Sequence, residues 1–276
     1  MSERINQSLE YARQAPQMRE TVFTPRWTLK RFVSWIKQDF GISCCRETVR
    51  KALKNLGFSW KKYRKLLNKA SPEKRAEFVE TLSGLLQEAT EGERQIIYID
   101  EAHIQLDTDE GYGWSVLGKR AWVSSSSVGL RKVSFFGVYL YNQGQTRIYP
   151  YLTADTESSC DVLKKIQEEF DFKKATVIWD GASYHKSDLV KEKAEELGME
   201  LQLLPAYSPD FMPVEHLWQW LREDVTYHAC HKDECELIQQ VRIFENNINL
   251  TPLAVADRLW TKTSIDLEEE KIRFSK

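Results

Sequence analysis

The chain lacks any long apolar run: nothing in its 276 residues approaches the roughly 18 consecutive apolar residues of a membrane-spanning helix. A signal peptide is not expected either, because the chain opens on the polar stretch MSERINQSLEYARQ. Cysteine is scarce: the five cysteines are odd in number and irregularly spaced, which indicates reduced thiols and no disulfide framework. Internal repeats and low-complexity tracts are absent too. These absences predict a folded cytoplasmic protein with no membrane partner.

Hydrophobic residues make up 42% of the chain and charged residues 29%, which suits one large domain and a small one. The net charge of −2 is unevenly distributed. Residues 26–75 contain fifteen Lys or Arg and three acids, a net charge of +12, so the rest of the chain carries −14. A basic segment beside an acidic one is typical of a nucleic-acid-binding module joined to a different domain.

The basic segment has the pattern of a helix-turn-helix. Apolar residues recur at helical spacing from Trp27 to Phe40, with Thr28 as a plausible N-cap and Gly41 as a stop. A second helix is predicted from Arg46 to Leu56. Two short helices joined by a tight turn are typical of a DNA-binding unit, although a plain helical hairpin has the same pattern.

Candidate DNA contacts follow from this arrangement. Five polar residues of the second helix are expected to face outward, toward bases and phosphates in a major groove. The next stretch, FSWKKYRKLL, interleaves aromatic and basic residues and is predicted to form a wing or extended arm along a phosphate backbone. The predicted DNA-binding residues are Arg46, Thr48, Arg50, Lys51, Lys54, Lys61, Lys62, Arg64 and Lys65.

The second module alternates strands and helices. Ser71, Pro72 and Glu73 start a lead-in helix that runs to about residue 89. The order that follows, β-β-β-α-β-α-β-α, predicts a ribonuclease H-like fold, an α/β architecture with a mixed sheet and helices on both faces. Two further helices near the C-terminus are expected to pack on this core or on a partner subunit. The strands are predicted at residues 95–101, 132–141, 147–152, 175–180 and 200–204, and the helices at 156–170, 187–198, 213–221, 234–246 and 252–260.

Three acids occupy comparable places in this second module. Asp100 and Asp180 each end a buried strand, and Glu215 lies in the first turn of the helix that follows the last strand. Each acid alone is more often a helix cap, a partner of the helix dipole or a surface charge. Because all three are expected at one edge of one sheet, a shared site is the better interpretation.

Carboxylates that close together repel one another, and a bound divalent cation removes the repulsion. An oxygen-only ligand set favours Mg²⁺, with Mn²⁺ as a substitute, over zinc. Two such ions, roughly 3.5–4 Å apart, can activate an attacking oxygen and stabilise a leaving one in phosphodiester cleavage. The sequence therefore predicts Asp100, Asp180 and Glu215 as both the metal-binding and the catalytic residues.

Three blocks of the sequence carry a family resemblance: IIYIDEAH, VIWDGASYHKS and LLPAYSPDFMPVEHLW. They resemble the catalytic blocks of the DDE transposases of bacterial insertion sequences in the Tc/mariner superfamily. The 34 residues between Asp180 and Glu215 match the spacing of the Asp-Asp-Glu version of that group. The resemblance implies cut-and-paste movement of a DNA element into TA dinucleotides. It also implies a homodimer bound to the element's terminal inverted repeats and to target DNA near the nucleoid.

Some positions depart from the family's pattern. Gly181 and Met212 stand where relatives often have Asn, which bears on how Asp180 and Glu215 are oriented. His185 matches a His common in the family; it is either an active-site neighbour that contacts a phosphate or a structural cap of the next helix. A metal-dependent nuclease without strand transfer, or a catalytically silent DNA-binding regulator, are the alternative functions.

The expected organisation has four parts. Residues 1–25 form an arm or linker, residues 26–70 the helix-turn-helix or winged domain, residues 71–228 the catalytic domain with its lead-in helix, and residues 229–276 the C-terminal helices and tail. Relatives often carry two helix-turn-helix units, whereas this chain has room for one. The first unit is therefore expected to be missing or to come from an upstream reading frame.

Overall fold

The computed structural model describes residues 27–60, 71–117, 120–125, 131–170, 172 and 174–264. The chain divides into two compact units, Met1–Lys65 and Leu66–Lys276. The predicted arm at residues 1–25 and most of the predicted basic arm after the second helix lie outside the described residues. Of the helices in the described ranges, none is long and apolar enough to cross a membrane.

The smaller unit contains the two predicted helices, α2 (Leu29–Phe40) and α3 (Arg46–Asn55). The Thr28 hydroxyl caps α2 by accepting from the Arg31 N–H at 3.3 Å. Gly41 ends α2 with a φ of 65°, a left-handed conformation that glycine adopts without strain. The two helices pack on each other through a small core formed by Trp35, Ile36, Val49 and Ala52.

The larger unit is built on a five-stranded mixed sheet in the order β3-β2-β1-β4-β5. Strands β1, β2 and β3 pair antiparallel, while β4 and β5 run parallel to β1. Gly144 makes the turn between β2 and β3 with a φ of 62°. The bounds are β1 (Gln95–Gln105), β2 (Lys132–Leu140), β3 (Gln145–Tyr151), β4 (Ala175–Trp179) and β5 (Met199–Leu203).

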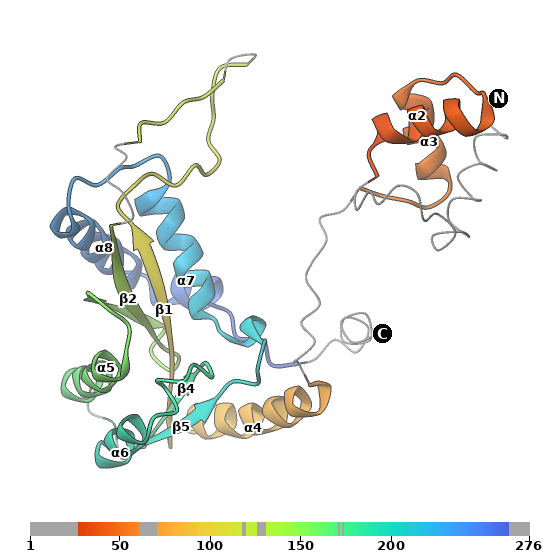
Figure 1. Cartoon of the computed structure of the whole chain (residues 1–276). Helices are drawn as coiled ribbons and strands as arrows, with labels where there is room; N and C mark the ends of the chain where they lie inside the picture. The colour runs from red at the N-terminus through yellow and green to blue at the C-terminus, as the bar shows by residue number, and fades with distance from the viewer. Residues whose placement is uncertain are drawn as a thin grey trace. The chain divides into compact units, whose positions relative to one another are not determined.

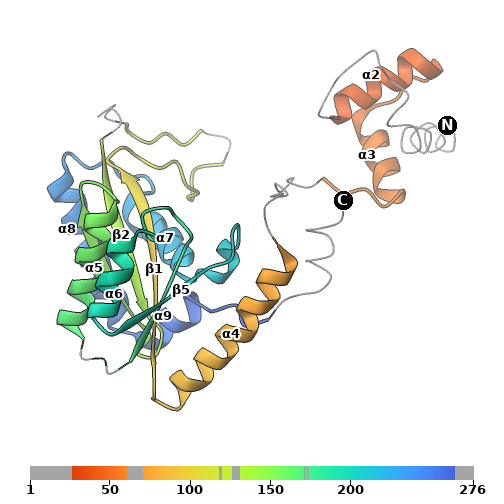
Figure 2. The ribbon, with the colours of Figure 1, turned by 60° about the horizontal axis from the view of Figure 1, so that its bottom comes forward.

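Helices cover both faces of this sheet (Figures 1 and 2). Alternate residues of each strand point to opposite faces, so the sheet separates two apolar clusters. One cluster joins the sheet to α5 (Thr156–Glu169) and α6 (Asp188–Glu196). The other joins it to α4 (Pro72–Thr90), α7 (Val214–Leu221), α8 (Glu234–Asn249) and α9 (Pro252–Arg258). This is the predicted ribonuclease H-like arrangement, and the C-terminal helices pack on its core as expected.

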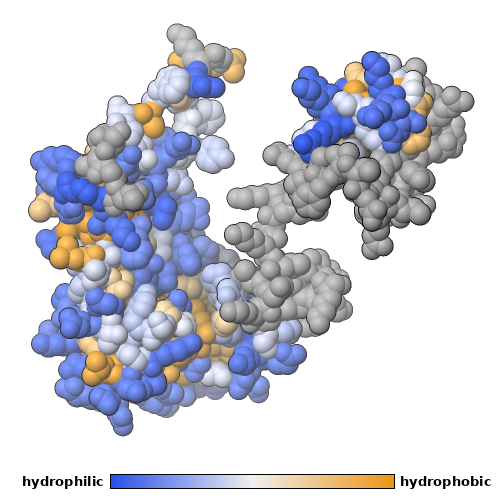
Figure 3. Space-filling view, in the orientation of Figure 1, coloured by the Kyte–Doolittle hydropathy of each residue, from blue (hydrophilic) through white to orange (hydrophobic). Residues whose placement is uncertain are grey.

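Residues 110–117 and 120–125, which lie between β1 and β2 in the sequence, extend away from the sheet (Figure 1). Their aromatic side chains are almost fully exposed: Tyr112 at 99%, Trp114 at 106% and Trp122 at 80%. Hydrophobic and hydrophilic residues mix on this projection in Figure 3. Its base is held at Asp109, whose carboxylate accepts from the Thr226 hydroxyl at 2.5 Å. The exposed rings therefore contribute nothing to the core of the larger unit.

Candidate active site

Asp100 projects from the middle of the sheet toward α7. It lies on the same strand face as Tyr98 and Ala102, which belong to the cluster on the α7 side. Its Oδ2 accepts a hydrogen bond of 2.9 Å from the indole Nε1 of Trp218, a residue of α7. Gly137 is paired with Asp100 on β2, and a Cβ there would lie 2.6 Å from the Trp218 ring. The missing side chain thus lets the indole approach the sheet and reach the carboxylate.

Asp180 follows the last residue of β4, so it is held by a loop and not by strand pairing. Because β4 runs parallel to β1, the C-terminal end of β4 lies beside the part of β1 that carries Asp100. Two donors fix Oδ1 of Asp180: the Ala182 N–H at 3.0 Å and Nδ1 of His185 at 2.7 Å. These hydrogen bonds, that of His185 first, lower the pKa of the Asp180 carboxyl.

Glu215 lies in the first turn of α7, as predicted, with Pro213 at the N-cap. Its N–H donates to the Met212 carbonyl at 3.2 Å. Upstream, the 3₁₀ turn Pro209–Phe211 is tied to α4 by Arg75, which is fully buried. Arg75 donates to both carboxylate oxygens of Asp210, at 3.0 and 2.8 Å. The ion pair therefore holds the start of α7, and with it Glu215, in place relative to α4.

The three acids lie close enough to affect one another's ionisation. Burial raises the pKa of Asp100 well above its ordinary value, and the charges of Glu215, Glu101 and Asp180 add to the effect. Partial burial also raises the pKa of Glu215; Asp180 adds to this, whereas His216 and Arg222 act in the opposite direction. Asp100 and Glu215 therefore resist losing their protons, and a cation bound beside them would stabilise their charged forms.

A cleft of about 700 Å³ opens beside two of these acids. Glu215, Gln219 and Arg222 line this cleft. They are four and three residues apart, so they lie on one side of the helix formed by α7 and the π-helical turn Arg222–Thr226 that follows it. Sequence reasoning missed Gln219 and Arg222, although their distance from Glu215 was a usable signal. The full lining is Asp100, Glu101, Ala102, His103, Glu215, His216, Trp218, Gln219 and Arg222.

His185 contacts Asp180, one of the three acids, and is 1% exposed. Its two ring nitrogens contact two carboxylates, Nδ1 that of Asp180 and Nε2 that of Glu101 at 2.9 Å. Burial lowers the pKa of His185, but the hydrogen bonds to Asp180 and Glu101 outweigh burial and raise the pKa overall. Sequence reasoning named His185 and missed Glu101, because Glu101 follows Asp100 directly and points to the opposite face of the strand.

The predicted DNA-binding residues are only partly described. On α3, Arg46, Lys51 and Lys54 are exposed, whereas Thr48 and Arg50 are half-buried. Arg50 also donates from Nε to Glu47 at 2.7 Å, so part of its hydrogen-bonding capacity is used within the helix. The other four predicted residues lie outside the described ranges: Lys61, Lys62, Arg64 and Lys65.

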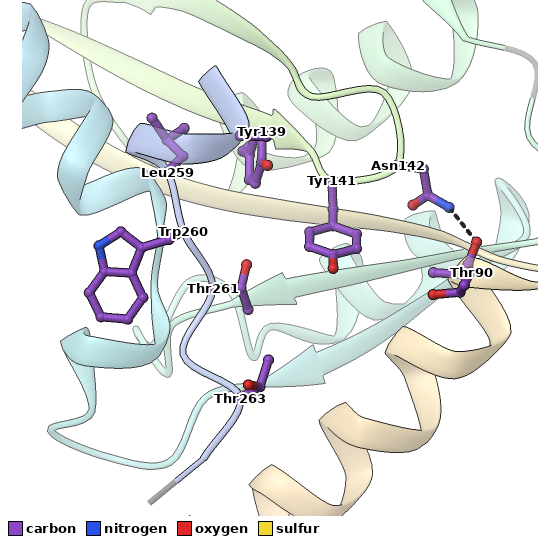
Figure 4. Close-up of a pocket in the computed structure, with 10 residues that line it drawn as sticks. Thr90, Tyr139, Tyr141, Asn142, Leu259, Trp260, Thr261 and Thr263 are labelled. Atoms are coloured by element: carbon purple, nitrogen blue, oxygen red, sulfur yellow. Dashed lines mark hydrogen bonds between the residues drawn. The ribbon is translucent and has the colours of Figure 1, made fainter. Parts of the chain in front are cut away.

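A second hollow, of about 550 Å³, lies where β2 ends and the chain passes beyond α9 (Figure 4). Its lining is aromatic and hydroxyl-bearing, with Tyr139, Tyr141, Trp260 and Thr261 among the residues. Asn142 closes one side by donating to the Ala89 carbonyl at 3.1 Å. None of the described residues that line this hollow is Asp, Glu, Lys, Arg or His, whereas the cleft at Asp100 has several such residues.

Two family models match the chain. Residues 95–238, just over half of it, match the family described as DDE superfamily endonuclease. Residues 24–82 match the family described as winged helix-turn helix, which supports a helix-turn-helix over a plain helical hairpin. The first match includes all three acids and the second includes α2 and α3.

The chain is similar to individual proteins over most of its length. The insertion element IS630 uncharacterized 39 kDa protein of Shigella sonnei is 24% identical over 230 residues, covering 82% of this chain. The chain spans 66% of the length of that curated relative. Among solved structures, the Mos1 strand transfer complex has a TM-score of 0.55 at 15% identity, covering 92% of this chain and 83% of that one. The mariner Mos1 paired end complex with Mg has a TM-score of 0.56 at 15% identity, covering 99% and 86%.

The structural matches and the family match support different conclusions. At 15% identity the Mos1 structures establish the fold alone. The family match covers the sheet, the acids and α7 in one continuous stretch. The chain therefore belongs to the DDE superfamily endonucleases, with a winged helix-turn-helix region ahead of the catalytic fold.

Proposed function

We infer that the protein is a DNA transposase that hydrolyses phosphodiester bonds at the ends of a DNA element and joins the freed 3′-hydroxyl to target DNA. One observation carries this inference: the charges of Glu215 and Asp180 act on Asp100, that of Asp180 acts on Glu215, and Asp100 and Glu215 line an open cleft. Cleavage and joining are both in-line attacks on phosphorus by an oxygen, so one set of acids serves both steps.

The donor set fits hard divalent cations. Asp100, Asp180 and Glu215 offer carboxylate oxygens, which Mg²⁺ and Mn²⁺ prefer. Burial first, and nearby acids second, raise the pKa values of Asp100 and Glu215, and a bound cation would stabilise their charged forms. These three residues would hold two Mg²⁺, with Mn²⁺ as a substitute. When bound, the ions would supply activation of the attacking oxygen and charge stabilisation at the leaving oxygen.

The chain's own side chains orient the site around the DNA. Trp218 holds Asp100 and leaves its Oδ1 for other interactions, while His185 and the Ala182 N–H hold Asp180. Arg222, half-exposed in the cleft, is positioned to contact a backbone phosphate as a charged donor. The cleft is open, which suits a DNA strand better than a small substrate.

The partners follow from the two units. The helix-turn-helix region is proposed to bind the terminal inverted repeats of the element through α3. Insertion at TA dinucleotides and action as a homodimer on paired ends are proposed from the family resemblance. Structures of Mos1 as a paired end complex and as a strand transfer complex agree in kind with this proposal.

Asp180→Ala tests the function directly. The full chain would be incubated with duplexes that end in the inverted repeats flanking its gene, with Mg²⁺ or Mn²⁺, and strand cleavage and joining would be measured on sequencing gels. The substitution removes one of the three carboxylates proposed to hold the metal ions, so cleavage and joining should fall to background while DNA binding is retained.

Asp188→Ala is the matched control, because Asp188 is an acid on the first turn of α6 whose side chain is 90% exposed. It should cleave like the unchanged protein. Cleavage by Asp180→Ala would refute the acid assignment. Cleavage without joining of pre-cut ends would identify a plain nuclease, and absence of Mn²⁺-dependent nicking would identify a silent DNA-binding regulator.

A further inference from the structure

Glu101 is an acid buried beside the active site with its own set of donors. It follows Asp100 on β1 but points to the opposite face of the sheet, where its side chain is 9% exposed. Its Oε1 accepts from the indole Nε1 of Trp179 at 3.0 Å and from Nε2 of His185 at 2.9 Å. Burying a carboxylate is unfavourable without such donors, so this placement is specific.

His185 connects Glu101 to the active site. The imidazole lies against the Trp179 ring, with ring centroids 3.9 Å apart and an angle of 30° between the planes. Nε2 is held by Glu101, and Nδ1 lies 2.7 Å from Oδ1 of Asp180. A ring that is stacked on one face and hydrogen-bonded at both nitrogens is fixed in orientation.

Asp180 needs this support because it lies beyond the end of β4, where strand pairing no longer holds the backbone. His185 and the Ala182 N–H both donate to Oδ1. Among the hydrogen bonds found within the described ranges, none uses Oδ2 of Asp180. The arrangement therefore fixes one oxygen of the carboxylate and leaves the other for a ligand.

The same three residues could be taken for a metal site. Glu101, Asp180 and His185 form the only group of three or more such ligands in the described part of the chain whose atoms all lie within 4.8 Å. However, the two carboxylates contact different nitrogens of one ring, and a single ion can bind only one of those nitrogens. Direct contacts of 2.7 and 2.9 Å are hydrogen-bond distances.

We propose that Glu101 is a positioning residue of the active site, which acts through His185 to orient the Asp180 carboxylate for metal binding. This inference rests on the proposed function, since it assigns Asp180 to the metal site. Residues that orient metal ligands in this way typically change metal affinity or activity by about 10- to 100-fold when they are removed.

The test is Mn²⁺ binding to the full chain, measured by electron paramagnetic resonance without DNA. Glu101→Ala should weaken Mn²⁺ binding by about 10-fold or more. Glu101→Gln keeps an oxygen in the place of Oε1 to accept from Trp179 and His185, so it should bind within about threefold of the unchanged protein. Because Glu101 acts through His185, the double variant Glu101→Ala/His185→Ala should bind no more weakly than His185→Ala.

His231→Ala controls for general destabilisation. His231 is a second buried histidine, which donates from Nε2 to the Val225 carbonyl at 3.2 Å. It should lower the melting temperature and leave Mn²⁺ binding unchanged. Unchanged binding in Glu101→Ala would overturn the proposal. Equal losses in Glu101→Gln and Glu101→Ala would overturn it too, because Glu101 would then act by its charge or as a ligand.

Two further measurements separate this inference from the proposed function. If Asp180→Ala binds Mn²⁺ like the unchanged protein, the metal assignment of Asp180 fails. Independently of any metal, ¹⁵N-histidine spectra should show protected ring N–H signals of His185 that disappear in Glu101→Ala and persist in Glu101→Gln. Signals that do not respond to Glu101→Ala would show that Glu101 does not hold the ring.

Discussion

At the scale of single residues, the candidate active site contains an acid, Asp100, that lowers the stability of the folded chain at neutral pH. Asp100 is buried next to other acids, and its folded-state pKa lies above that of the unfolded chain. The folded state therefore holds a proton that the unfolded state releases. As pH rises through the ordinary Asp value of 3.8, this acid opposes folding, and the penalty is complete above its folded pKa.

Asp100→Asn should therefore stabilise the protein while abolishing cleavage. The amide keeps an oxygen for the Trp218 indole and removes the charge. In EDTA at pH 7 the melting temperature should rise by about 2 to 4 °C, which corresponds to roughly 1 kcal/mol in a chain of this size. Calorimetry as a function of pH checks this, and the gain should vanish below about pH 4.

Asp188→Asn is the comparison for that measurement. Asp188 is exposed, lies in the first turn of α6 and pairs with Lys191 at 3.1 Å, so the same change there should lower stability slightly. A fall in melting temperature for Asp100→Asn at pH 7 would mean that Asp100 is stabilised by its surroundings, contrary to its raised pKa.

At the scale of elements, the contact between β2 and α7 determines where Glu215, on α7, lies relative to Asp100. A Cβ at Gly137 would lie 2.6 to 2.9 Å from the Trp218 ring and the Val214 side chain, both on α7. Gly137→Ala should therefore push α7 off the sheet, at a cost of about 1 to 3 kcal/mol. It should also reduce cleavage, because the Trp218 hydrogen bond to Asp100 depends on that contact. Chemical denaturation and the cleavage assay check both effects.

Gly84→Ala is the control, and its expected effect on stability has the opposite sign. Gly84 lies on α4, and a Cβ there meets nothing within 4 Å. Alanine should stabilise that helix by about 0.5 to 1 kcal/mol and leave cleavage unchanged. Equal stability changes in the two variants would show that the close approach at Gly137 is unimportant.

A second contact between elements is the ion pair of Arg75 and Asp210, which joins α4 to the segment that precedes Glu215. Burial would raise the pKa of Asp210, but hydrogen bonds from Arg75 and Lys262 outweigh it and hold the pKa far below the ordinary value. A depressed pKa means that the carboxylate stabilises the fold above the unfolded value of 3.8, and that this contribution is lost as pH falls below it.

Asp210→Asn should destabilise the protein by about 3 kcal/mol at pH 7, because it removes the negative charge that pairs with the fully buried Arg75 at 2.8 Å. The difference from the unchanged protein should shrink as the pH is lowered from 5 toward 2. Urea unfolding at several pH values measures it. A difference that stays constant over this range would indicate that the charge of Asp210 is not what stabilises the contact.

At the scale of the whole molecule, basic residues gather in the segment 26–75, which contains the helix-turn-helix and the start of the larger unit. Residues 26–75 carry a net +12, and the remaining residues carry −14. Binding to the phosphate backbone releases counterions in proportion to the number of phosphates contacted. The basic segment should therefore determine how DNA affinity depends on salt.

Arg46→Ala and Lys51→Ala, both exposed on α3, should each weaken DNA binding and lower the slope of log affinity against log salt by about 1. Fluorescence anisotropy at several salt concentrations measures the slope, and Mn²⁺ binding at the acids should not change. Lys164→Ala, on α5 and paired with Glu168 at 3.6 Å, serves as the control. An equal change in slope for Lys164→Ala would place DNA binding elsewhere.

The sequence alone was enough to predict the order and type of the elements. Alternation and helical spacing of apolar residues depend on local geometry, so the helices from Leu29 and Arg46 and all five strands were predicted within a few residues. The cap at Thr28 was predicted for the same reason. Asp100 and Asp180 were predicted because each ends an apolar run, and Glu215 because it lies in the first turn of the helix after the last strand.

The tertiary structure alone decided what surrounds those acids. Glu101 lies next to Asp100 in sequence but on the other face of β1, and its partner His185 is 84 residues away. Trp218 reaches Asp100 across 118 residues, through space left by Gly137. Such contacts depend on strand register and on how closely α7 packs against the sheet. Both are properties of the assembled core and leave no pattern in any one stretch of sequence.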